Sequence, residues 1–149
     1  MKKNIIVWLL ISLASICAQS HGEDKYGPHK GFVRMPGAFH TELVLDGKNK
    51  FKVYLLDIQW KNPSVVKSQI QAKLNNKIEA KCEIQKSESE SYFSCALPSK
   101  VDLTQKGELR ILAVREGQQG AEAIYPLPLK LETPAVVSPS EHSGHGGHH

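Results

Sequence analysis

The sequence predicts an all-β protein, an antiparallel β-sandwich of about seven strands with immunoglobulin-like topology. Three observations lead to this prediction. Short segments with alternating apolar and polar residues follow one another from Phe39 to Leu131, turn residues separate them, and no segment has a convincing helical period. Residues 65–73 come nearest to a helix, but their apolar residues form a poor stripe.

Each predicted strand has one apolar face that would point into a core. The first alternates from Phe39 to Leu45, and the following Asp46-Gly47 is a hairpin turn signal. Pro126 and Pro128 confine the last strand to an edge or a bulge. The predicted strands are 39–45, 51–58, 68–74, 78–84, 92–97, 108–115 and 121–131.

The first twenty residues have the anatomy of a secretory signal peptide. A short basic start is followed by an apolar run from Ile5 to Ile16 and then by small and polar residues. The run is well short of the roughly 20 residues that span a bilayer. We therefore expect export to the periplasm or outside the cell, with no stable membrane anchor after cleavage. A cut after Ser20 and a cut after Ala18 both fit the sequence.

Two segments of different composition flank the predicted sandwich. Residues 21–38 are rich in glycine, proline, histidine and charge, and predict a flexible arm. From Thr133 onward proline, serine and glycine–histidine repeats predict a disordered tail. The predicted organisation is a signal peptide at 1–20, an arm at 21–38, a sandwich domain at 39–132 and a tail at 133–149.

Charge and motifs exclude several classes of function. The chain has 19 basic and 15 acidic residues, and loss of Lys2 and Lys3 with the signal leaves 17 basic residues and a net charge of +2. This balance is too mild to predict nucleic-acid binding. The sequence has no nucleophile elbow and no phosphate-binding glycine loop. We therefore expect a protein that is not an enzyme.

After export only Cys82 and Cys95 remain of the three cysteines. A pair of cysteines in an exported chain predicts a disulfide, which would tie two neighbouring strands or the two sheets. The short loop that it closes suggests roughly 3 kcal/mol of stabilisation. The alternative is a metal site with two thiolates, although the spacing matches no common zinc or iron–sulfur pattern.

All seven histidines lie outside the strand-forming region that follows His40. Imidazole binds copper, nickel and zinc, and a tail with glycines between its histidines can fold around an ion. The predicted metal ligands of the tail are His142, His145, His148 and His149. The alternative is a solvated end without a ligand.

His21 is a candidate ligand that depends on the cleavage site. A cut after Ser20 makes it the first residue, so that its amine and ring nitrogen chelate one ion. A cut after Ala18 makes it the third, where amine, backbone nitrogens and imidazole form a square-planar set for Cu(II) or Ni(II). Otherwise it is only part of the arm.

A further candidate site combines His29, Met35, His40 and Glu42. Met35 is the only methionine after the signal, and a thioether with imidazoles suits Cu(I). His40 and Glu42 are two residues apart on a predicted strand, so both project from the face opposite Phe39. The alternative is that Met35 packs on the sandwich edge and His40 is an ordinary surface residue.

Residues 21–45 carry a resemblance to known proteins. The runs His21-Gly22-Glu23-Asp24-Lys25, Gly27-Pro28-His29, Met35-Pro36-Gly37 and Phe39-His40-Thr41-Glu42-Leu43 resemble small exported bacterial proteins that handle copper and heavy metals. The Pro-His-x-Gly run and the following Gly-x-x-His-x-Glu-Leu are also similar to the metal-binding segment of periplasmic efflux adaptors. Lys30 departs from that pattern, which usually has glycine there. The resemblance implies that His29, Met35 and His40 contact the metal and that an efflux system is the partner.

The leading hypothesis is therefore a periplasmic copper-binding chaperone, scavenger or resistance factor without catalytic activity. Zinc and nickel also fit the ligand types. A second hypothesis is an interaction module of the cell envelope that binds a protein through a sheet edge, with an incidental histidine tail. A third is a copper redox enzyme in which His21 chelates the ion and His40 adds a ligand.

Overall fold

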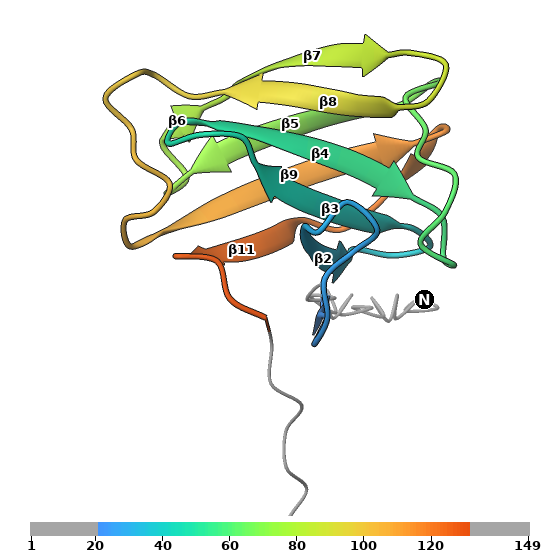
Figure 1. Cartoon of the computed structure of the whole chain (residues 1–149), viewed down its shortest axis with the longest axis horizontal. Coiled ribbons are helices and arrows are strands. Elements are labelled where there is room, and N and C mark those ends of the chain that lie inside the picture. The colour runs from blue at the N-terminus through green and yellow to red at the C-terminus, as the bar shows by residue number, and fades with distance from the viewer. Residues whose placement is uncertain (1–20, 132–149) are drawn as a thin grey trace, which may run out of the picture.

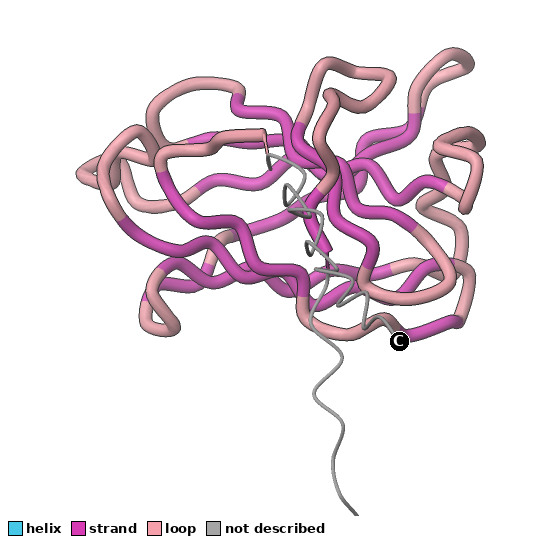
Figure 2. Tube along the Cα trace, turned by 90° about the horizontal axis from the view of Figure 1, so that it is seen from below, coloured by secondary structure: helices cyan, strands magenta, loops and turns pink. Residues whose placement is uncertain are grey.

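The computed structural model describes residues 21–131, and all regular structure in this part of the chain is β-strand. The strands form two antiparallel sheets that pack against each other, as the sequence predicts (Figure 1). Strands and loops without helices are also seen in Figure 2. Residues 21–131 thus contain no helix that is long and apolar enough to cross a membrane.

The first sheet has six strands, and the neighbours in it are joined by antiparallel ladders. In spatial order they are β1 (His21–Gly22), β2 (Phe32–Met35), β3 (His40–Leu45), β4 (Lys50–Leu56), β8 (Ser91–Ala96) and β7 (Lys81–Lys86). The second sheet has β9 (Gly107–Arg115) and β5 (Gln69–Leu74) side by side at its centre. Its shorter strands are β6 (Ile78–Glu79), which pairs with β5, and β10 (Gln118–Gln119) and β11 (Ala123–Leu127), which pair with β9.

The core lies between the sheets and is built by the alternation in the sequence. Phe51, Val53 and Leu55 are fully buried on one face of β4, and Leu109 and Ile111 of β9 are fully buried opposite them. Burial of such side chains contributes about 1.5–3 kcal/mol each, which fixes the register of every strand that has one buried face.

One predicted strand is divided in the structure. The sequence predicts a single strand at residues 78–84, but β6 ends at Glu79 and β7 begins at Lys81 in the other sheet. Ala80 is buried at this crossover, and its N–H donates to the carbonyl of Ala72. Ile84, an apolar residue of this predicted strand, is 54% exposed, because β7 is the last strand of its sheet.

The predicted disulfide is confirmed. Cys82 of β7 and Cys95 of β8 are bonded and lie directly opposite each other in the ladder. The bond therefore ties two neighbouring strands of the first sheet and does not join the two sheets.

The segment 21–38, which the sequence predicts to be an irregular arm, contains two strands. β2 pairs with β3 and β1 pairs with β2, so the first sheet extends beyond the residues assigned to the sandwich. Val33 is buried, and Pro36 follows β2 closely. A four-residue strand is too short to give a measurable period, which explains why the pattern missed it. The predicted tail, residues 133–149, and the predicted signal peptide, residues 1–20, lie outside the described residues.

Candidate functional site

The candidate site lies on the outer face of the first sheet, over β2, β3 and β4. On β3, Thr41 and Leu43 face the core, whereas His40 and Glu42 alternate with them and point outward. Both outward residues are nevertheless buried, with exposures of 3% for His40 and 0% for Glu42. Contacts of Glu23, His29 and Gly31 with these two residues show that the segment between β1 and β2 covers this face.

Glu42 holds the covering segment in place. Its Oε1 accepts hydrogen bonds from the backbone N–H groups of His29 at 2.8 Å and Gly31 at 2.9 Å. Its Oε2 lies 2.7 Å from Nδ1 of His29. A buried carboxylate is costly unless its oxygens are hydrogen-bonded, and here both oxygens have partners. The sequence predicted Glu42 as a metal ligand, but both of its oxygens are engaged by the covering segment.

His29 is fixed on two sides. Its ring stacks on Tyr54 of β4 with 3.7 Å between ring centroids and 4° between ring planes. Because Nδ1 donates to a carboxylate, the neutral ring carries its lone pair at Nε2. The imidazole is 26% exposed.

Burial raises the pKa of the Tyr54 hydroxyl to about 12, and the charge of Glu90 adds to this effect. Tyr54 is therefore neutral at physiological pH and offers His29 an uncharged ring surface.

His40 is oriented by a backbone carbonyl. Its Nδ1 lies 3.1 Å from the oxygen of Asp57, and since a carbonyl only accepts, Nδ1 carries the proton. In the neutral ring Nε2 then holds the lone pair. Nε2 lies 3.9 Å from Oε1 of Glu23, and the ring meets the Trp60 indole edge to face at 5.7 Å between centroids.

The loop after β4 presents Trp60 in a defined position. The Asp57 carboxylate accepts hydrogen bonds from the backbone of Gln59 and Lys61 and from the side chain of Asn62. The pKa of the Asp57 carboxyl is lowered, and the hydrogen bond from the Lys61 backbone is the largest cause. Trp60 has a φ of 62°, in the left-handed region that non-glycine residues rarely adopt. The alternation in the sequence does not reveal the contact of Trp60 with His40.

The register brings three predicted metal ligands onto neighbouring strands. The backbone of His21 pairs with Met35, and Arg34 pairs with Thr41, so that Met35 and His40 are adjacent where the β2–β3 ladder ends. Met35 is 37% exposed. The sequence could not have revealed this alignment, because it depends on the pairing of β1, which no pattern predicts.

The predicted set of His29, Met35, His40 and Glu42 is thus divided. His29 lies with Glu42 and Tyr54, whereas His40 contacts Glu23 and Trp60. Met35 lies just beyond the last pair of the β2–β3 ladder, as His40 does. Among residues 21–131 no group of three or more histidine, cysteine, aspartate or glutamate side chains could hold a metal ion. The tail ligands His142, His145, His148 and His149 lie outside the described residues.

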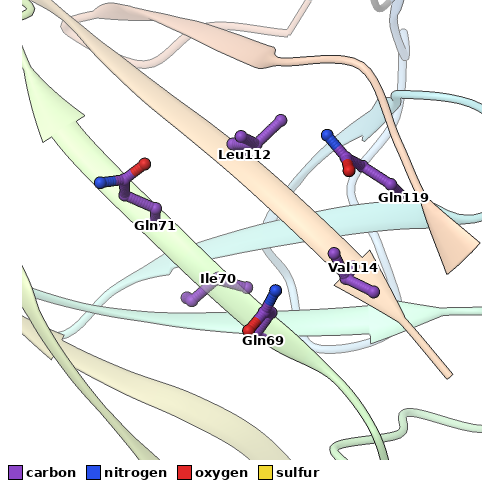
Figure 3. Close-up of a pocket in the computed structure, with 6 residues that line it drawn as sticks. All are labelled: Gln69, Ile70, Gln71, Leu112, Val114 and Gln119. Atoms are coloured by element: carbon purple, nitrogen blue, oxygen red, sulfur yellow. The ribbon is translucent and has the colours of Figure 1, made fainter. Parts of the chain in front are cut away.

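A hollow on the other sheet is separate from this site. It has a volume of about 240 Å³ and lies on the outer face of β5 and β9 (Figure 3). It is lined by Gln69, Ile70, Gln71, Leu112, Val114 and Gln119. None of these side chains titrates or is a usual metal ligand, so the hollow offers only amide hydrogen bonds and aliphatic contact.

Comparison of the chain with protein-family models, curated proteins and solved structures finds no match. The geometry of the site and the ligand types in the sequence are therefore the evidence for its function.

Proposed function

We propose that this protein binds copper at the end of the β1–β2–β3 ladder and handles it without catalysis, as a chaperone, scavenger or resistance factor. The observation that carries the proposal is the orientation of His40. Histidines that bind metals almost always donate their second ring N–H to a carbonyl or carboxylate, which fixes the ring and directs the other nitrogen to the ion. His40 has this arrangement, with Nδ1 on the Asp57 carbonyl and the lone pair at Nε2.

Met35 favours copper over the other candidate metals. A thioether is a soft ligand that selects Cu(I), whereas zinc and nickel are well served by imidazole alone. Met35 and His40 are the next residues beyond the last pair of the β2–β3 ladder, Arg34 with Thr41, and Met35 is partly exposed. The carboxylate of Glu23, near Nε2 of His40, supplies a negative charge that favours a cation.

The proposed export signal places a further donor at the same position. If cleavage follows Ser20, the new α-amine belongs to His21, the residue paired with Met35. Cleavage after Ala18 would move the amine two residues away and leave His21 third. The periplasmic or extracellular location, the tail histidines as a second site and an efflux system as partner belong to the same proposal and rest on the sequence.

The immunoglobulin-like topology that the sequence predicts is supported by the strand order. An immunoglobulin constant-type domain has strands A, B, E and D in one sheet and G, F and C in the other. In chain order β3, β4, β5, β7, β8, β9 and β11 take the places A to G, because β3-β4-β8-β7 face β11-β9-β5. We propose that β1 and β2 extend such a domain beyond strand A.

The test is a copper titration of residues 21–149 in which the four tail histidines are replaced by asparagine, so that the tail does not compete. We expect one Cu(I) to bind, with His40→Ala and Met35→Leu each weakening binding at least about tenfold, the loss of roughly 1.4 kcal/mol. The matched control is His29→Gln, which removes an imidazole held by Glu42 and should change affinity less than twofold. Copper binding no tighter than micromolar in the parent protein would contradict the proposal.

A second candidate is the interaction module. The observation that favours it is β7, an edge strand that exposes Ile84 between Glu83 and Gln85. In this case partner binding would be lost in Ile84→Lys and would be equal with and without copper.

A further inference from the structure

The indole of Trp60 already has a cation beside it. The ammonium of Lys25 lies 5.1 Å from the centre of the Trp60 ring. The centres of the His40 and Trp60 rings are 5.7 Å apart. The face of an aromatic ring is electron-rich, and tryptophan attracts cations most strongly of the aromatic side chains. The ring is thus a cation-binding surface beside His40.

One residue positions both aromatic rings. The backbone oxygen of Asp57 holds Nδ1 of His40, while its carboxylate holds the loop that presents Trp60. These hydrogen bonds hold Trp60 in its uncommon left-handed backbone conformation. Such preorganisation removes part of the ordering cost of binding an ion.

We infer that the site is a Cu(I) site in which Met35 and His40 bind the ion and Trp60 contacts it through its ring, where the ion replaces the Lys25 ammonium. This inference rests on the proposed function and deepens it. Cu(I) is soft and monovalent, so it suits a thioether, one imidazole and a ring face, whereas Cu(II) and zinc favour several nitrogen or oxygen ligands. Entry of the ion would displace Lys25, because two cations cannot share one ring face.

The composition supplies a probe for each of two contacts. Residues 21–149 contain a single tryptophan, Trp60, and a single methionine, Met35. Trp60 emission and the ¹³C-methyl resonance of Met35 therefore each report one residue. The added ions are Cu(I) under anaerobic reducing conditions and Ag(I), a monovalent ion without redox chemistry. Both are added to the protein in which the four tail histidines are replaced by asparagine.

We expect Trp60 emission to change and to saturate at one equivalent of either ion, together with a shift of the Met35 methyl resonance. Zn(II) should cause neither change at one equivalent. Trp60→Leu should weaken Cu(I) binding about fivefold, in line with the strength of a cation–π contact. Lys25→Gln should strengthen it about threefold, and this gain should disappear in the Trp60→Leu background. Lys30→Gln, which removes another exposed charge of the same segment, is the matched control.

The outcomes separate this inference from the proposed function. A Met35 shift at one equivalent without a change in Trp60 emission, and with unchanged affinity in Trp60→Leu, would overturn the role of Trp60 and leave the proposed copper site standing. An equal response to Zn(II) would overturn the assignment to Cu(I). If neither Met35 nor Trp60 responds to Cu(I) or Ag(I), both the inference and the proposed structured site are wrong.

Discussion

Glu42 shows how one buried carboxylate can organise a surface segment. It lies on the outward face of β3, where a charged residue would normally be solvated, but it is fully buried. Donors from His29 and Gly31 replace the water that burial removed. Glu42 thereby positions the segment that includes Glu23 and Lys25, whose charges lie beside His40 and Trp60 of the proposed copper site.

Replacing Glu42 by alanine should lower the free energy of unfolding by about 3 kcal/mol, because three donors would lose their acceptor and a cavity would remain. Urea unfolding of the variant and the parent measures this loss. Glu88→Ala, at an exposed carboxylate, is the control and should stay within about 0.5 kcal/mol of the parent. A loss below 1 kcal/mol in Glu42→Ala would mean that these hydrogen bonds do not hold the segment.

The raised pKa of Tyr54 should make the stability of the protein decrease at alkaline pH. This pKa is raised from 10.0 to about 12 by burial, so the folded protein keeps a proton there that the unfolded chain loses. The contribution of Tyr54 is complete below pH 10, decreases between pH 10 and 12 and is lost above that range. Between pH 9 and pH 11 the parent should therefore lose about 1 kcal/mol more stability than Tyr54→Phe. Burial also raises the pKa of Tyr125, but this effect is common to both proteins. Equal losses would contradict the burial of the Tyr54 hydroxyl.

At the scale of the elements, the sequence predicts strands that have a regular alternation of apolar and polar residues. It does not predict features that depend on which strands and loops pair in space. The strands around Leu43, Val53 and Ile111 follow from their alternation, since each has one face in the core. The same alternation placed His40 and Glu42 on one face. Period does not reveal a four-residue strand such as β2 or contacts between distant loops, so the roles of Asp57 and Trp60 could not be predicted. The crossover at Ala80 was missed because an unbroken apolar alternation runs through it.

The covering segment depends on glycine where its backbone lies close against β3. A Cβ on Gly31 would lie 2.6 Å from the backbone oxygen of Leu43 and from a methyl group of Val44. Gly31→Ala should therefore displace the segment from the sheet and increase amide hydrogen exchange at His29 at least about tenfold, which corresponds to roughly 1.4 kcal/mol. Gly37→Ala is the control, since a Cβ there would lie 3.8 Å from its nearest neighbour. Unchanged exchange in Gly31→Ala would show that the segment can shift without losing its hydrogen bonds.

For the whole molecule, the described residues form one core with the candidate site on its outside. The core residues come from both sheets, and the disulfide closes a hairpin far from the β1 edge. The proposed copper site uses residues of the outer face and a loop, so it can vary without repacking the core. Stability and metal binding should accordingly be separable by truncation.

Residues 21–131 should fold without residues 132–149, because both sheets and the hydrophobic core lie within that range. We expect the truncated protein to unfold in urea within about 0.5 kcal/mol of residues 21–149, since no core residue is removed. The truncated protein should bind one Cu(I) with the same affinity as residues 21–149 in which the tail histidines are replaced. It should bind fewer Cu(II) ions than unaltered residues 21–149, because four imidazoles are lost. A large loss of stability would mean that the tail is part of the fold. Unchanged Cu(II) stoichiometry would instead show that the tail histidines are not metal ligands.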